Sequence, residues 1–353
     1  RRPHDNFIVV VPEQYTMETQ KKLVHMHSRK GILNIDVVSF ERLAYKVFEE
    51  LGGGNRPVLD DTGKNLIVRR VLEKEKKKLD YFGSSIEKTG FVSELKSVIS
   101  ELLQYGITPQ QLGEIGENVK EKQQLSAKLK DIRLVYKEFM AFLSTNYITS
   151  EEILDVLCGL VEKSKLIAGS EIIFDGFTGF TPIQYKLMRL LLVYSKDIKI
   201  SVTIDKKERP TGHEGWNNLF FMSKEMMNRL IAICEEEGIN VDDTVCVDRD
   251  INYRYEGAKD LAYLERNLFR YKGGVYTGTP ENIRIYEGSN PKEELQYIVS
   301  EILQLTRKEG FRYRDIAVVT ADLETYGKVA ANMMKKNDIP AFLDYKRSVA
   351  AHT

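Results

Sequence analysis

The stretch IIFDGFTGFTP, residues 172–182, contains the aspartate of this chain that most resembles a reactive group. In nucleotide-hydrolysing α/β proteins a magnesium-holding aspartate ends a buried strand, and a further residue positions the attacking water. Asp175 ends such an apolar run, but Gly176 follows where an acidic partner would stand and has no side chain for that role. The alternative is an ordinary Asx turn eased by Gly176 and Gly179, and the residues by themselves favour it.

Two further apolar runs end in polar and aromatic residues. The candidates are Gln14 and Thr16 after the first run, Phe40, Arg42 and Tyr45 after the second, and Phe177 and Phe180 beside Asp175. Amides, hydroxyls and guanidinium groups bind base edges and phosphates, while aromatic rings stack on unpaired bases. Helix capping and core packing are the alternative for each, and for Phe40 alone they are the better explanation. Three such ends at one sheet edge favour a nucleic-acid interface.

A phosphate-binding loop cannot be found in this chain. That loop requires Gly-x-x-x-x-Gly-Lys followed by serine or threonine, between a strand and a helix. TGKN, at 62–65, places Asn65 where the hydroxyl should be and follows a loop, so we expect it to begin a helix. A phosphate loop would have to precede Arg1, where it would complete a nucleotide site around Asp175.

The elements that must position these residues alternate between strands and helices. Apolar runs at 7–11, 34–38, 171–175 and 197–204 read as strands, and helices follow at 13–28, at 40–51 after the N-cap residue Ser39, and from Pro182. Buried, β-branched runs that alternate with helices predict an α/β fold with a parallel sheet.

Two other parts interrupt or follow that pattern. Residues 60–161 show helical spacing of apolar residues without a convincing strand. After a linker at 271–282, strands are predicted at 283–287, 315–320 and 339–344, with a helix at 293–308 and another ending at 336. We therefore predict a first α/β domain at 1–50 and 165–275, a helical insertion at 51–164, and the start of a second α/β domain at 276–353.

Composition restricts the class of protein. The 353 residues are 42% hydrophobic, as expected for globular domains, and Lys+Arg and Asp+Glu are 52 each. A neutral chain has no broad cationic coat, although a local basic groove remains open to it. Three widely spaced cysteines favour reduced thiols in the cytoplasm over disulfides or a zinc site. No apolar run reaches membrane-spanning length, and without an initiator methionine we expect a piece of a longer protein.

The order of the segments resembles a known family. VPEQYT, SFERLAYKVF, IIFDGFTGFTPIQ and the final stretch EELQYIVSEILQLTRKEGFRYRDIAVVTADLETYGKVAANMMKKNDIPAFLD are similar to the AddB component of the bacterial AddAB helicase/nucleases, over essentially the whole chain. The resemblance implies a superfamily 1 helicase-like, RecA-like fold. It also implies that VPEQYT and SFERLAY touch single-stranded DNA and that IIFDGF is the magnesium-aspartate strand.

The resemblance further implies a function in double-strand break repair. Family members hold the strand that emerges from the motor of the AddA helicase/nuclease subunit, and they recognise the recombination sequence Chi without translocating. Gln14 and Thr16 would read bases, Phe40 and Tyr45 would stack, Arg42 would contact phosphate or base, and Phe177 and Phe180 would add to this surface. ATP and Mg²⁺ would belong to the longer protein, whereas the iron–sulfur cluster and the nuclease metal would lie beyond Thr353. The alternative is an ATP-driven helicase motor in which Asp175 serves an active site.

Overall fold

The chain forms two compact units, residues 1–248 and residues 249–353, which are described separately. The computed structural model describes residues 5–28, 30–52, 57–88, 90–119, 121–149, 152–205, 208, 209, 211, 212, 215–247, 253–269 and 273–343, with the backbone alone at 144–146.

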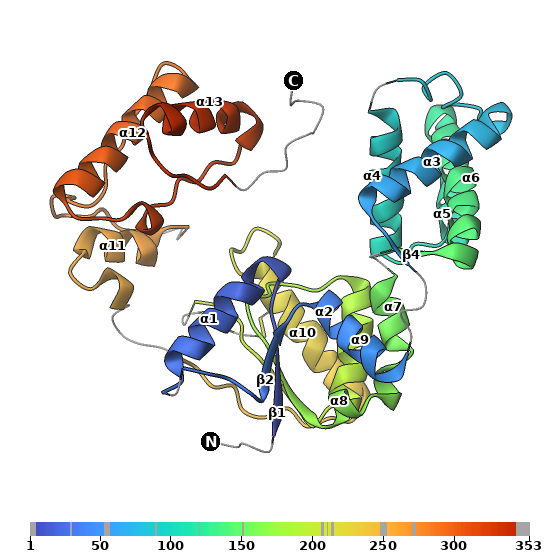
Figure 1. Cartoon of the computed structure of the whole chain (residues 1–353), viewed down its shortest axis with the longest axis horizontal. Helices are drawn as coiled ribbons and strands as arrows, with labels where there is room; N and C mark the ends of the chain where they lie inside the picture. The colour runs from blue at the N-terminus through green and yellow to red at the C-terminus, as the bar shows by residue number, and fades with distance from the viewer. Residues whose placement is uncertain are drawn as a thin grey trace. The chain divides into compact units, whose positions relative to one another are not determined.

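The first unit contains the parallel sheet that the sequence predicts (Figure 1). Its strands are β1 (Asn6–Val10), β2 (Ile35–Val38), β5 (Ser170–Phe174) and β6 (Asp197–Ile200). They lie in the order β2-β1-β5-β6, and every neighbouring pair is parallel. β6 ends at Ile200, so the strand predicted at 197–204 is shorter than expected. The α/β class and its parallel sheet are confirmed.

As the sequence predicts, helices follow β1, β2 and β5: α1 (Thr16–Met26) after a 3-10 turn at Glu13–Tyr15, α2 (Phe40–Leu51) and α9 (Pro182–Tyr194). Two short helices, α7 (Ile153–Cys158) and α8 (Lys165–Ala168), precede β5, and α10 (Phe221–Glu236) comes after β6. The Ser39 side chain accepts a hydrogen bond from the backbone N–H of Arg42 at 3.3 Å, which confirms the predicted N-cap of α2. Pro182 is the first residue of α9, and Thr181 and Gln184 cap it reciprocally.

The core of this sheet forms around its two central strands, β1 and β5, which carry buried apolar residues on both faces. Val10, Ile172 and Phe174 are fully buried, and they pack with the inner residues of α2, α7 and α9. Burial of each such side chain stabilises the fold by about 1.5–3 kcal/mol before the entropy cost is counted. This tight core fixes the positions at which the chain leaves each strand.

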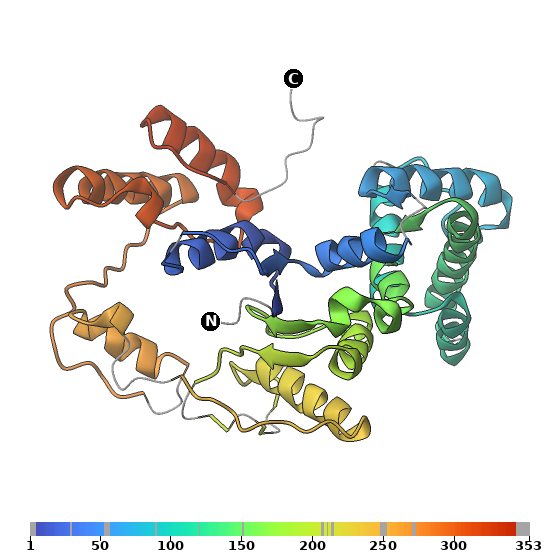
Figure 2. The ribbon, with the colours of Figure 1, turned by 60° about the horizontal axis from the view of Figure 1, so that its bottom comes forward.

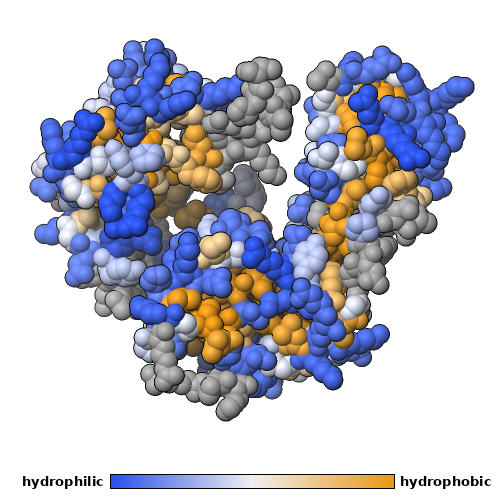
Figure 3. Space-filling view, viewed as in Figure 1, coloured by the Kyte–Doolittle hydropathy of each residue, from blue (hydrophilic) through white to orange (hydrophobic). Residues whose placement is uncertain are grey.

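Residues 61–146 form a separate helical body. Its helices are α3 (Asp61–Glu75), α4 (Phe91–Gln104), α5 (Pro109–Asn118) and α6 (Gln123–Asn146). They pack side by side around their own hydrophobic core (Figures 1 and 2). The TGKN stretch begins α3 as predicted, with the Asp60 carboxylate accepting from the Gly63 N–H at 2.7 Å. Some hydrophobic residues of this body stay exposed, and they form orange areas between hydrophilic ones in Figure 3.

The predicted limits of the insertion need two corrections. A short parallel pair, β3 (Val58–Leu59) and β4 (Ile148–Thr149), occurs where no strand was expected. In addition, Ile153 and Leu157 of α7 are fully buried in the core of the sheet and not in that of the helical body. The hydrophobic core therefore changes near residue 148, earlier than the predicted boundary at 164. Periodicity alone did not find this point because α7 is amphipathic in the same way as the helices before it.

One buried carboxylate holds the helical body together locally. Asp131 of α6 is fully buried, and its two oxygens accept from the backbone N–H groups of Asp80, Tyr81 and Phe82 at 3.0, 2.8 and 2.9 Å. These donors follow the end of α3, so Asp131 fixes the chain where it turns away from that helix. Backbone N–H groups buried without an acceptor would cost free energy, which explains an ionisable group inside a core.

The second unit contains α11 (Lys259–Asn267), α12 (Pro291–Lys308) and α13 (Leu323–Lys336). Asp260 accepts from the backbone N–H groups of Glu281 and Asn282 at 2.9 and 2.7 Å. The hydrogen bonds from Asn282 lower the pKa of the Asp260 carboxyl. Residues 259–267 therefore belong with the second unit, and the predicted boundary at 275 lies too late.

The three strands predicted for the second unit are wrong for its described residues. Segments 283–287, 316–320 and 339–343 are not strands there, and Ile285, Val319 and Phe342 are 95, 90 and 90% exposed. A β-branched run becomes a strand when a neighbouring strand pairs its backbone groups, and sequence cannot supply that neighbour. α12 and α13 nevertheless pack on one another around Val299 and Met334.

Candidate nucleic-acid interface

The carboxyl ends of the four strands meet at one edge of the sheet. Hydrogen bonds continue just past the strands, from the Val11 N–H to Val38 O (2.9 Å), from Asp175 to Val10 (3.0 Å) and from Ser201 to Phe174 (2.8 Å). The segments that leave the strands therefore start side by side. Ligands of open α/β sheets bind outside this edge. We call it the strand-end edge.

Asp175 lies on this edge with an exposed side chain. The hydroxyl of Ser201, the first residue after β6, donates a short hydrogen bond to Oδ1 of Asp175. Gly176 then adopts a φ of +80°, a left-handed conformation that strains any residue with a Cβ. A Cβ at that position would lie 3.5 Å from Cδ of Pro12, an ordinary contact, so the backbone and not crowding favours glycine. The second acid is thus missing at a position where the backbone conformation disfavours any residue other than glycine.

The segment after β1 presents Gln14 and buries Thr16. Gln14 lies in the 3-10 turn and is exposed. Thr16 is 5% exposed, and its hydroxyl donates to the Glu13 carbonyl at 3.0 Å. The predicted base-reading role of Thr16 is therefore not supported by this position, because its hydroxyl caps the turn that carries Gln14.

The segment after β2 presents Arg42 and Tyr45 from the first turns of α2. Residues three apart on a helix are neighbours on its surface. The Arg42 side chain is 58% exposed, and its Nε donates to Oε1 of Glu13 at 3.2 Å. Tyr45 is 38% exposed. Partial burial and the neighbouring Glu41 carboxylate raise the pKa of Tyr45.

Phe40, Phe177 and Phe180 form a cluster and do not project as separate rings. The Phe40 centroid lies 5.4 Å from that of Phe177 and 5.9 Å from that of Phe180, and both pairs are edge-on. Phe174 of β5 packs against all three rings. Phe40 is 7% exposed, so little of its ring is available for the predicted stacking on a base in this structure. Phe177 and Phe180 are partly exposed and pack on the same core.

Sequence reasoning missed two partners on this edge. Ser201 bonds Asp175, and Glu13 pairs with Arg42 across the segments that follow β1 and β2. Ser201 could have been anticipated, because it directly follows β6 at the level where this strand pairs with the end of β5. The Glu13–Arg42 pair has no such signal, since a separation of 29 positions along the chain fixes neither side-chain direction.

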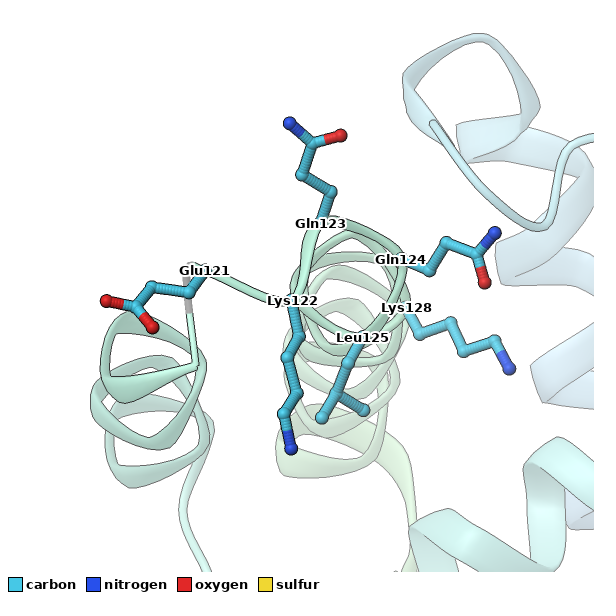
Figure 4. Close-up of a pocket in the computed structure, with 6 residues that line it drawn as sticks. All are labelled: Glu121, Lys122, Gln123, Gln124, Leu125 and Lys128. Carbon is cyan, nitrogen blue, oxygen red and sulfur yellow. The ribbon is translucent and has the colours of Figure 1, made fainter.

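No metal centre competes with this edge in the described part of the chain. Among those residues, no group of three histidine, cysteine, aspartate or glutamate side chains could hold a metal ion. A shallow hollow at the start of α6 is lined by Glu121, Lys122, Gln123, Gln124, Leu125 and Lys128. Their side chains point to several different sides of the helix start, so the six do not converge on one ligand (Figure 4).

Comparison with known proteins decides the family. Residues 1–265 match the family described as "ADDB, N-terminal". The chain belongs to this family. Proteins named as the B subunit of an ATP-dependent helicase/deoxyribonuclease are similar to it over nearly its whole length, as the resemblance predicts. The relative from Lachnoclostridium phytofermentans is 40% identical over 352 residues, that from Caldanaerobacter subterraneus subsp. tengcongensis 36% over 345, and that from Symbiobacterium thermophilum 35% over 351.

The chain corresponds to one part of those relatives. The three matches cover 99, 97 and 98% of the chain but 31, 29 and 30% of the respective relatives. Within the described residues, none of the helices has the length and apolar character needed to cross a membrane.

Proposed function

We propose that this chain is the N-terminal part of the B subunit of an ATP-dependent helicase/deoxyribonuclease, and that its strand-end edge binds single-stranded DNA and recognises Chi. The names of the relatives support the helicase/deoxyribonuclease part. The complex would act in DNA repair and recombination in the cytoplasm. The partner would be the AddA helicase/nuclease subunit.

The exposure of Gln14, Arg42 and Tyr45 on one edge carries this proposal. An amide can bond a base edge in two directions, a guanidinium binds phosphate or base, and a phenol ring stacks on an unpaired base. The Arg42–Glu13 ion pair also joins the segments after β1 and β2, so the groups keep a common orientation. Preorganisation of this kind lowers the entropy cost of binding.

The turn at Gly176 favours a chain that holds the DNA strand over one that translocates along it. Motors of this type need a side chain that positions the attacking water beside the magnesium aspartate. Gly176 has none, and its φ of +80° disfavours a residue that would. Asp175 keeps an exposed carboxylate, so Mg²⁺ with ATP in the longer protein fits this position better than hydrolysis does. The iron–sulfur cluster and nuclease metal would be held by other parts of that protein.

The test is a double substitution in the complete two-subunit complex. Changing Gln14 and Arg42 to alanine should abolish the arrest at Chi while unwinding continues at its normal rate. The matched control is Gln20→Ala with Lys22→Ala, an exposed amide and cation further along α1. If the Gln14 and Arg42 variant still responds to Chi, the assignment of this edge is wrong.

An ATP-driven motor is the second candidate, because Asp175 is exposed where a magnesium ligand of a motor would lie. DNA-stimulated ATP hydrolysis by the full-length protein without its partner separates the two functions. We expect no turnover above background. Turnover that disappears in Asp175→Asn would favour the motor and overturn the non-translocating function.

A further inference from the structure

The segment between β6 and α10 exposes the single tryptophan of the chain. Trp216 is 85% exposed, and Leu219 and Met222 beside it are each 62% exposed. A large aromatic side chain left in water loses the free energy that burial would give it, which is about 1.5–3 kcal/mol for side chains such as Phe. An exposed tryptophan is therefore a feature that requires an explanation.

This segment starts and ends at the strand-end edge. It follows β6, whose carboxyl end is level with that of β5 through the Ser201–Phe174 hydrogen bond. It ends in α10, whose first turn lies against the segment after β5, because a Cβ added at Gly179 would lie 3.7 Å from Cε of Met222. The segment is thus the fourth of the strand-end segments, next to the one that follows Asp175.

An ion pair and a turn fix described parts of this segment. Nζ of Lys224, which is 1% exposed, lies 2.5 Å from Oε2 of Glu208, so the segment is tied to α10 at Glu208. The Asn218 N–H donates to the Gly215 carbonyl at 2.9 Å, and the Asn218 side chain accepts from the Phe220 N–H at 2.8 Å. Trp216 therefore lies inside a hydrogen-bonded turn just before α10.

A base suits this surface better than a protein does. A stable protein interface buries about 800 Å² on each partner, whereas a tryptophan side chain contributes about 150–250 Å². Trp216, Leu219 and Met222 are too few to form such an interface alone. One indole ring is, in contrast, enough to stack on one base, and the proposed contacts at Gln14 and Arg42 already place DNA along this edge.

We propose that Trp216 stacks on an unpaired base of the bound single strand and extends the DNA contact to the segment after β6. This inference rests on the proposed function, since it needs single-stranded DNA at the strand-end edge. Stacking of a base on an aromatic ring is tolerant of sequence, so Trp216 would hold the strand while Gln14 and Arg42 read it.

The experiment measures the affinity of the full-length two-subunit complex for a fluorescent single-stranded oligonucleotide by anisotropy. Trp216→Ala should weaken binding about 5- to 150-fold, the range for loss of one stacked base. Trp216→Phe should retain most of the affinity, because a phenyl ring still stacks. The salt dependence should not change, because tryptophan carries no charge. Leu33→Ala is the matched control, an exposed apolar residue just before β2, at the opposite edge of the sheet.

The outcomes separate this inference from the proposed function. If Trp216→Ala binds DNA normally while the Gln14 and Arg42 variant loses Chi recognition, the inference is wrong and the proposed function stands. If neither variant changes DNA binding or Chi recognition, both are wrong. If Trp216→Ala impairs assembly of the two-protein complex while DNA affinity stays unchanged, the residue docks a protein and the inference is overturned.

Discussion

Asp131 of α6 and Asp175 on the strand-end edge are both acids that bond a segment leaving another element, but their surroundings are opposite. Asp131 is fully buried and accepts from three consecutive backbone N–H groups. Asp175 is exposed, and its carboxylate accepts from the Ser201 hydroxyl. A carboxylate enclosed by backbone donors serves the fold, while one that faces water has room for a ligand. This contrast separates a structural acid from a candidate binding group in the same chain.

The largest expected effect is that of Asp131→Ala on the helical body. The substitution leaves three N–H groups without their acceptor, and we expect a loss of about 3–5 kcal/mol in the free energy of unfolding of this body. Hydrogen exchange in the full-length protein measures it, as faster exchange of the amides of residues 80–82. The matched control is Asp80→Ala, which removes only the exposed pair with Lys130 and should cost at most about 1 kcal/mol.

The same measurement tests whether Asp131 is a structural carboxylate. If Asp131→Ala and Asp80→Ala cost the same, the three backbone hydrogen bonds do not stabilise the helical body. Burial would then be no guide to which carboxylates of this chain are structural.

The next effect concerns the turn after Asp175. Gly176→Glu restores an acid at this position, but a residue with a Cβ at a φ of +80° should cost about 1–2 kcal/mol. We expect this loss of stability together with no gain in DNA-stimulated ATP hydrolysis by the full-length protein. Denaturant unfolding and a turnover assay measure the two quantities.

Gly159→Ala is the control for Gly176→Glu. Gly159 has a φ of −72°, and a Cβ there would make an ordinary 3.5 Å contact with the Val156 carbonyl, so the substitution should change stability little. ATP turnover in Gly176→Glu that depends on Asp175 would show that the edge is a motor lacking one side chain. That result would turn Asp175 from a binding group into a catalytic one.

The centre of the sheet could be predicted from sequence because β1 and β5 are largely buried on both faces. The apolar runs that contain Val10 and Phe174 can be recognised as strands from their residues alone. Ser39 and Pro182 mark the starts of the helices α2 and α9. The predicted strands around Ile285 and Val319 have the same composition but no described neighbour to pair with. Composition therefore indicates that a segment suits a strand, whereas pairing depends on residues elsewhere in the protein.

The candidate site was predictable only in part for a similar reason. Gln14 and Arg42 are exposed as the interface requires, whereas Phe40 and Thr16 are turned inward by the ring cluster and by the Glu13 carbonyl. A strand-end position fixes where a residue begins but not which way its side chain points. Trp216 was missed because the residues between β6 and α10 have no regular pattern that would assign it to the edge.

The smallest expected effect is that of Asp175→Ala on stability. The side chain is exposed, and one hydrogen bond with Ser201 should contribute only about 0.5–1.5 kcal/mol, as judged by denaturant unfolding. Ser201→Ala should cost the same, and the double variant should cost no more than either single one, because both remove one shared interaction. A loss as large as that of Asp131→Ala would instead show that Asp175 is a structural carboxylate. The case for a ligand at the strand-end edge would then depend on Gln14, Arg42 and Tyr45 alone.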